Sequence, residues 1–136
     1  MLRPRVSVTL DAAARIATVR YVGAINGDVI IPEVLRLYGA LERPWEYDCL
    51  WDMRRHTGHT ETRDNEALAR GWQAMCGGRD IGRLTAIISG DPLIEARLKL
   101  TQRLFPFRTL EVFPTIEAGR AWIETARADL EAPSVA

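Results

Sequence analysis

With 136 residues, of which 47% are hydrophobic and 26% charged, the chain can form one domain whose core needs no disulfide or metal. Its 18 basic residues balance its 18 acidic ones and include no long basic run, so we expect no broad surface for nucleic acid. No apolar stretch reaches the roughly 18 residues that span a membrane, and residues 1–5 lack the apolar part of a signal peptide. We therefore expect a cytoplasmic protein without membrane insertion.

The first part of the chain predicts a β-hairpin followed by a helix. Polar and apolar residues alternate over residues 5–10 and again over 15–23, with a turn between the two runs. Apolar residues then recur at helical spacing over 29–41, where Pro32 falls in the first turn and is tolerated.

The middle of the chain predicts two buried strands with a helix between them. Residues 47–53 form a short apolar run typical of a strand covered on both faces, and residues 84–89 form another. Helical spacing returns from about residue 63, and either Thr62 or Asp64 is the expected N-cap.

The last part of the chain predicts a helix, a strand and a second helix. Residues 90–92 supply a cap and a first-turn proline for a helix that ends before Pro106. Residues 109–113 are the last predicted strand, and Thr115 caps the final helix.

The predicted order is β-β-α-β-α-β-α-β-α, in which a hairpin precedes strand and helix units that favour parallel pairing. The fold class is therefore α/β, as a single domain over residues 1–130 with a loose tail at 131–136. The strand at 5–10 can form an edge of the sheet, and an edge strand offers a self-complementary surface, so we expect a homodimer.

Three segments of the chain resemble the SpoIIAA-like branch of the STAS fold. They are Trp51-Asp52-Met53, the strand and turn from Thr85 to Pro92, and the ending from Val112 to Trp122. The resemblance covers residues 5–124 and implies a mixed sheet of about five strands with helices packed on one side. Members of the family act as anti-sigma factor antagonists, as cytoplasmic parts of anion transporters, or have no known activity.

Residues 50–66 are the most polar segment of the chain and lie between the run at 47–53 and the following helix. In the antagonist proteins the matching strand ends in an aspartate, an apolar residue and a phosphorylatable serine. Here Asp52 and Met53 match, but Arg54 stands in the place of the serine. The resemblance therefore implies a regulatory or protein-interaction module without catalysis, whose regulatory protein partner contacts this segment.

The candidate phosphoacceptors in place of the serine are Thr57, Thr60 and Thr62. Arg54, Arg55 or Arg63 lies close enough in sequence to pair with a phosphate. The alternative is that these threonine hydroxyl groups bond local backbone groups and cap or solvate the loop.

The segment also holds both histidines, His56 and His59, with Asp52 and Glu61 nearby. This set suggests a metal-dependent enzyme, in which the histidines bind zinc or act as bases. It is the third of the functions that we consider, after protein interaction and ligand binding. The spacing is not the four-residue separation that places two histidines on one helix face, and no nucleophile is identifiable. We therefore expect no metal, no cofactor and no enzyme activity.

The second function that we consider is binding of a small apolar, amphipathic or anionic ligand, because some relatives of the fold bind apolar ligands. Trp51 and Trp72 flank the polar segment and can wall a pocket between the sheet and the helices. Arg54, Arg55 or His56 would then lie at its entrance. The residues expected to bind a ligand or a partner are Trp51, Asp52, Arg54, Arg55, His56 and Trp72.

Overall fold

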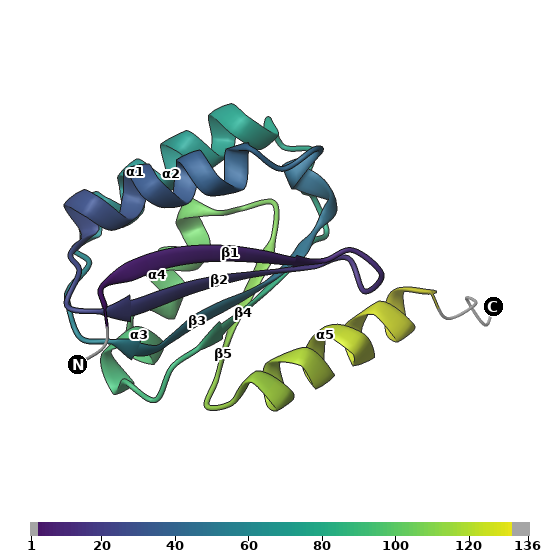
Figure 1. The fold of residues 1–136 in the computed structure, drawn as a ribbon. Helices are drawn as coiled ribbons and strands as arrows, with labels where there is room; N and C mark the ends of the chain where they lie inside the picture. Colours follow the sequence, from purple (N-terminus) through teal and green to yellow (C-terminus); the bar gives the residue numbers. More distant parts are fainter. Residues whose placement is uncertain (1–2, 132–136) are drawn as a thin grey trace.

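The computed structural model describes residues 3–131, in which a five-stranded sheet lies between helices (Figure 1). The strands are β1 (Arg5–Asp11), β2 (Ile16–Gly23), β3 (Asp48–His56), β4 (Leu84–Ile88) and β5 (Thr109–Phe113). They lie side by side in chain order; β1 is antiparallel to β2, and all other neighbours are parallel. The predicted α/β class and mixed five-stranded sheet are confirmed.

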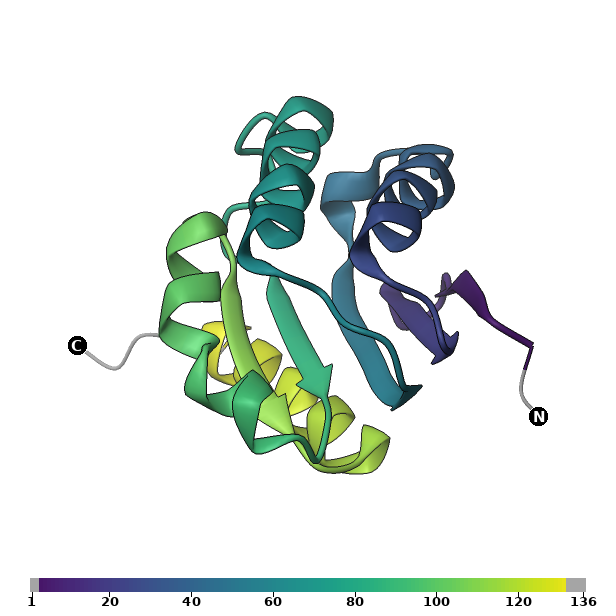
Figure 2. The same cartoon turned by 90° about the vertical axis from the view of Figure 1, so that its left-hand side faces the viewer.

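Helices cover both faces of this sheet, so the expectation that they pack on one side is wrong. The helices are α1 (Gly27–Gly39), α2 (Thr62–Cys76), α3 (Pro92–Ala96), α4 (Leu98–Leu104) and α5 (Ile116–Glu131), with a 3-10 turn η1 (Pro44–Glu46). α1 and α2 lie over one face and α5 over the other, as Figures 1 and 2 show, while α4 packs against β5 and α2. No helix within residues 3–131 is long and apolar enough to cross a membrane.

The two faces need covering because the central strands are apolar on both sides. Cys49 lies in the cluster under α1 and α2, together with Tyr38 and Trp72, whereas its neighbour Leu50 lies with Ile123 in the cluster under α5. Successive side chains of a strand point to opposite faces of the sheet. A strand with apolar side chains on both faces must therefore be covered by other elements on both faces.

α5 lies close to the sheet because Gly119 faces β4. A Cβ at this position would lie 2.6 Å from Cδ1 of Ile88 and 3.0 Å from Cβ of Ala86, closer than packed side chains allow. The helix continues to Glu131, the first residue of the predicted tail, and residues 132–136 lie outside the described part of the chain.

Two differences from the predicted elements are larger than a shift of one or two residues. The single helix expected before Pro106 is divided into α3 and α4 at Arg97, which caps one and precedes the other. β3 continues through Arg54, Arg55 and His56, residues expected in a loop, because β2 provides a parallel partner as far as its end at Gly23.

Candidate functional site

The pleat of β3 separates the predicted site residues onto opposite faces of the sheet. Trp51 packs with Trp72 under α1 and α2, at 5.9 Å between ring centroids. Asp52 is the next residue, and it lies on the face that carries Leu50 and α5. The six residues expected to bind a ligand or partner therefore do not form one site.

A pocket of about 90 Å³ lies beside Trp51 and Trp72 and is partly open to solvent. It is formed between the sheet, α2 and the pair α3 and α4. Its apolar lining consists of Tyr21, Trp51, Met53, Leu68, Trp72, Ile87, Ile94, Leu98, Phe105 and Leu110. The pocket that the sequence predicted between sheet and helices, next to these two tryptophans, is present in the structure.

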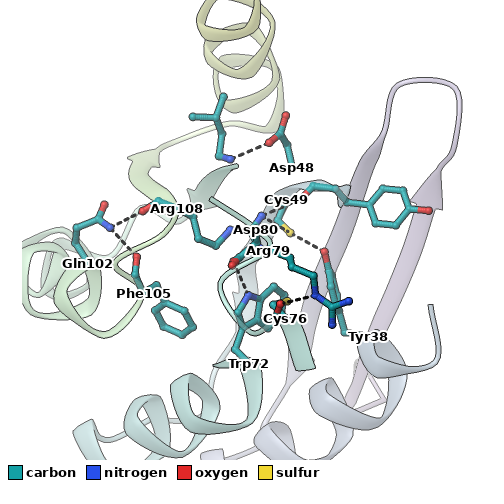
Figure 3. A network of polar contacts seen from close by, with 12 residues as sticks. Tyr38, Asp48, Cys49, Trp72, Cys76, Arg79, Asp80, Gln102, Phe105 and Arg108 are labelled. Carbon is teal, nitrogen blue, oxygen red and sulfur yellow. Dashed lines mark hydrogen bonds and ion pairs between the residues drawn. The ribbon is translucent and has the colours of Figure 1, made fainter. Parts of the chain in front are cut away.

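The polar atoms of the aromatic wall are bonded within the protein. Nε1 of Trp51 donates a hydrogen bond to the hydroxyl oxygen of Tyr21 at 2.8 Å, and Nε1 of Trp72 donates to Oδ2 of Asp80 at 3.0 Å (Figure 3 shows the second bond). Phe105 packs edge-on against Trp72, at 6.4 Å between centroids. Burial raises the pKa of Tyr21, which keeps its hydroxyl protonated. The wall therefore presents ring carbons to the pocket.

No sequence pattern indicates Arg108, a lining residue that is 4% exposed. Its Nη2 donates a hydrogen bond to the carbonyl oxygen of Tyr47 at 2.8 Å, and its Nη1 lies 3.5 Å from Oδ2 of Asp80. Nε and Nη1 are buried and have no hydrogen-bond partner within the described residues. Arg108 comes just before β5 and belongs to no periodic pattern, so only its three-dimensional contacts identify it.

Gln102 on α4 holds the segment that carries Arg108. Its side-chain nitrogen donates to the carbonyl oxygens of Phe105, at 3.0 Å, and of Arg108, at 2.6 Å (Figure 3). Its side-chain oxygen accepts a bond from the N–H of Leu110 at 2.8 Å. One amide side chain thus ties the end of α4 to the start of β5 and sets the position of the Arg108 backbone.

Asp52 and Arg54 form an ion pair on the opposite face and do not line the pocket. Oδ1 of Asp52 accepts a bond from Nε of Arg54 at 2.9 Å, and Oδ2 accepts one from Nε of Arg20 at 2.9 Å. Burial alone raises the pKa of Asp52, but the hydrogen bonds from Arg54 and Arg20 outweigh burial and lower this pKa to about 2. The expectation that Arg54 lies at the pocket entrance is therefore wrong.

The comparison with solved structures identifies the fold. A crystal structure of an uncharacterized protein from the DUF3478 family, described as having a SpoIIAA-like fold and coming from Shewanella loihica PV-4, matches with a TM-score of 0.57. The match covers 88% of this chain and 92% of that chain at 14% sequence identity. The fold is SpoIIAA-like. The sequence matches no family model and no curated protein.

In this SpoIIAA-like domain the remaining two residues of the predicted entrance also lie outside the pocket lining. Arg55 is exposed near the end of β3. Nε2 of His56 lies 2.6 Å from the carbonyl oxygen of Ile25, and its ring packs edge-on against Tyr21 at 5.4 Å. His59 is exposed, and within residues 3–131 no three His, Cys, Asp or Glu side chains gather as metal ligands.

The three candidate phosphoacceptors have different surroundings. Thr57 is exposed in the loop after β3, and Thr62 is exposed as the first residue of α2. Thr60 is half-buried and lines the pocket. Neither predicted N-cap is correct: Glu61 is the N-cap of α2, and its backbone N–H donates a hydrogen bond to Oδ2 of Asp64 at 2.7 Å.

Proposed function

We propose that this SpoIIAA-like domain is a non-catalytic binding module for a small, largely apolar ligand held beside Trp51 and Trp72. The observation that carries the proposal is the aromatic wall of the pocket, whose N–H groups are already bonded to Tyr21 and Asp80. A concave site with mostly apolar lining and few polar groups is the usual form of a small-molecule site.

The size of the pocket limits the ligand class. A dry apolar cavity of about 150 Å³ holds benzene. A pocket of about 90 Å³ that opens to solvent accommodates a short alkyl chain or part of a ring, with the remainder of the ligand at the opening. Long acyl chains exceed this volume, so we expect ligands with few carbon atoms.

The experiment that tests this proposal uses hexanol as an uncharged apolar probe and follows the indole N–H signals of Trp51 and Trp72 by NMR. We expect both signals to shift in a saturable way. The pocket-filling variant is Leu98→Phe, and its matched control is Leu100→Phe, because Leu98 lines the pocket whereas Leu100 on the same helix is 59% exposed. Equal responses of the two variants, or no response of the unmodified protein, would reject a ligand site here.

A protein-interaction role is the second candidate function, and the loop between β3 and α2 favours it. Thr60 of this loop lines the pocket, while Thr57 and His59 are exposed to solvent. A partner that contacts the exposed loop residues could therefore respond to a ligand on the other side of the same loop. We also propose a homodimer, because among residues 3–131 the edge strand β1 pairs with β2 alone.

A further inference from the structure

The pocket lining includes a charged group, the guanidinium of Arg108, whose hydrogen-bonding capacity is only partly used. Arg108 donates one well-formed bond, from Nη2 to the carbonyl oxygen of Tyr47, and its Nη2 also lies 3.6 Å from Sγ of Cys49. Its Nε and Nη1 are buried without a hydrogen-bond partner in the described residues. Buried donors are nearly always paired in folded proteins, so Nε and Nη1 have the capacity to donate to a further acceptor.

The charged residues that line the pocket are both arginines, Arg97 and Arg108, and the lining contains no aspartate or glutamate. Arg97 is half-buried at the junction of α3 and α4 and forms no ion pair within residues 3–131. Two cationic groups in an apolar pocket favour an anionic group on the ligand.

Asp80 compensates part of the charge of Arg108 but lies outside this pocket. Its Oδ2 accepts the N–H of Trp72 at 3.0 Å and lies 3.5 Å from Nη1 of Arg108. Asp80 lines a second, smaller cavity, which Trp72 and Arg108 also line. Its carboxylate therefore contacts Arg108 from outside the main pocket, and the described charged residues that line the main pocket are both cationic.

Resting on the proposed function, we propose that the ligand is a small apolar carboxylate whose alkyl or aryl part packs against Trp51 and Trp72 and whose carboxylate is bound by Arg108 and Arg97. Part of a carboxylic acid with about six carbon atoms occupies the volume of about 90 Å³, and the remainder lies at the opening. Nε and Nη1 of Arg108 are buried, so binding of a carboxylate oxygen to them requires a movement of Arg108 or of a neighbouring lining residue.

The test compares hexanoate with hexanol, which has the same chain length and no charge. We expect hexanoate to bind about ten-fold more tightly than hexanol at neutral pH, because charge-assisted hydrogen bonds to arginine are about twice as strong as neutral ones. This preference should fall as the pH is lowered through the pKa of the ligand carboxyl group. Equal affinity for the two probes would overturn the carboxylate assignment and leave the proposed function intact, whereas failure of both probes to bind would reject the site itself.

Three variants show which arginine recognises the carboxylate. Arg97→Met changes a half-buried side chain and should reduce the ratio of hexanoate affinity to hexanol affinity. Arg108→Met leaves Asp80 buried and unpaired, so this variant can fail to fold. The double variant Arg108→Met with Asp80→Asn removes both charges and keeps an acceptor for Trp72. We expect it to reduce the preference for hexanoate to the part that Arg97 supplies, and an undiminished preference for hexanoate in both folded variants would overturn the proposal.

Discussion

Arg127 near the end of α5 donates a hydrogen bond from Nε to Oδ2 of Asp48, at 2.7 Å, and thereby joins the last helix to the first residue of β3. Its Nη1 and Nη2 donate to the carbonyl oxygens of Ala14 and Arg15 in the hairpin turn, at 2.6 and 3.0 Å. Oδ1 of Asp48 accepts a further bond from the N–H of Leu84 at 2.8 Å. One guanidinium thus connects the hairpin, the centre of the sheet and the last helix.

Replacement of Arg127 by methionine should lower the free energy of unfolding by about 2 kcal/mol, because Asp48 is 2% exposed and would be left as a buried unpaired carboxylate. Urea denaturation at neutral pH measures the change. The matched control is Arg120→Met on the same helix. Arg120 pairs with the exposed Asp11, and an exposed pair contributes at most about 1 kcal/mol. Equal losses for the two variants would contradict the role assigned to Arg127.

Asp52 should make the stability of the protein depend on pH at the acidic end. Its pKa is lowered to about 2 in the folded protein from an ordinary value of 3.8. A depressed carboxyl pKa stabilises the fold above the unfolded-state pKa, and this stabilisation is lost as the pH falls toward the folded-state pKa. At pH 7 the Asp52→Asn variant should therefore be less stable by about 2 kcal/mol.

The measurement for Asp52 is urea denaturation of both proteins between pH 7 and about pH 2. The difference between them should stay constant down to the unfolded-state pKa and then shrink, because Asp52 becomes protonated and matches the neutral asparagine. Asp129→Asn changes an exposed carboxylate on α5 and serves as the control. A difference that persists unchanged through the acidic range would show that the ion pairs with Arg20 and Arg54 do not stabilise the fold.

The secondary structure was predictable from sequence because its signals are local. Alternation over residues 5–10 and 15–23 gave the hairpin, and the last strand was predicted with its observed bounds, Thr109–Phe113. The two-sided helical cover follows from the apolar pattern of β3, yet the family resemblance implied a single covered side. The same alternation places Trp51 and Asp52 on opposite faces, although they are adjacent in the sequence and were expected in one site.

The pocket was predictable only in part. Trp51 and Trp72 flank one polar segment, which suggested a common wall, and they do line the same pocket. Arg108 was not predictable because its partner Tyr47 lies 61 residues away in sequence. Local patterns carry no information on which distant carbonyl or carboxylate a single arginine meets after folding.

The edge of the sheet gives a prediction on oligomeric state. β1 pairs with β2 on one side, so the outward N–H groups of alternate β1 residues have no strand partner. Pairing of two β1 strands would form a dimer and protect these N–H groups from hydrogen exchange. We expect sedimentation at the mass of a dimer, and slower exchange of these N–H groups at concentrations where the dimer forms. A monomer at all concentrations would contradict the proposed homodimer.

The loop between β3 and α2 should respond to ligand on both of its sides. Thr60 lines the pocket, whereas Thr57 and His59 are exposed and their backbone N–H groups donate to Gly23 and Asn26. Gly58 lies so close to the carbonyl of Ile25 that a Cβ there would overlap with it, so the loop cannot shift without moving these contacts. A ligand that displaces Thr60 should therefore change the surroundings of the exposed residues.

Backbone amide NMR during a hexanol titration measures this response. We expect the signals of Thr57 and His59 to shift with the same midpoint as the indole signals of Trp51 and Trp72, and the Leu98→Phe variant to lose all four responses together. The N–H of Ile123, a buried residue of α5, lies on the opposite face of the sheet and should not move. If the tryptophan signals shift while the two loop signals stay fixed, ligand binding is not transmitted to the loop surface, and the protein-interaction role would have to be independent of the pocket.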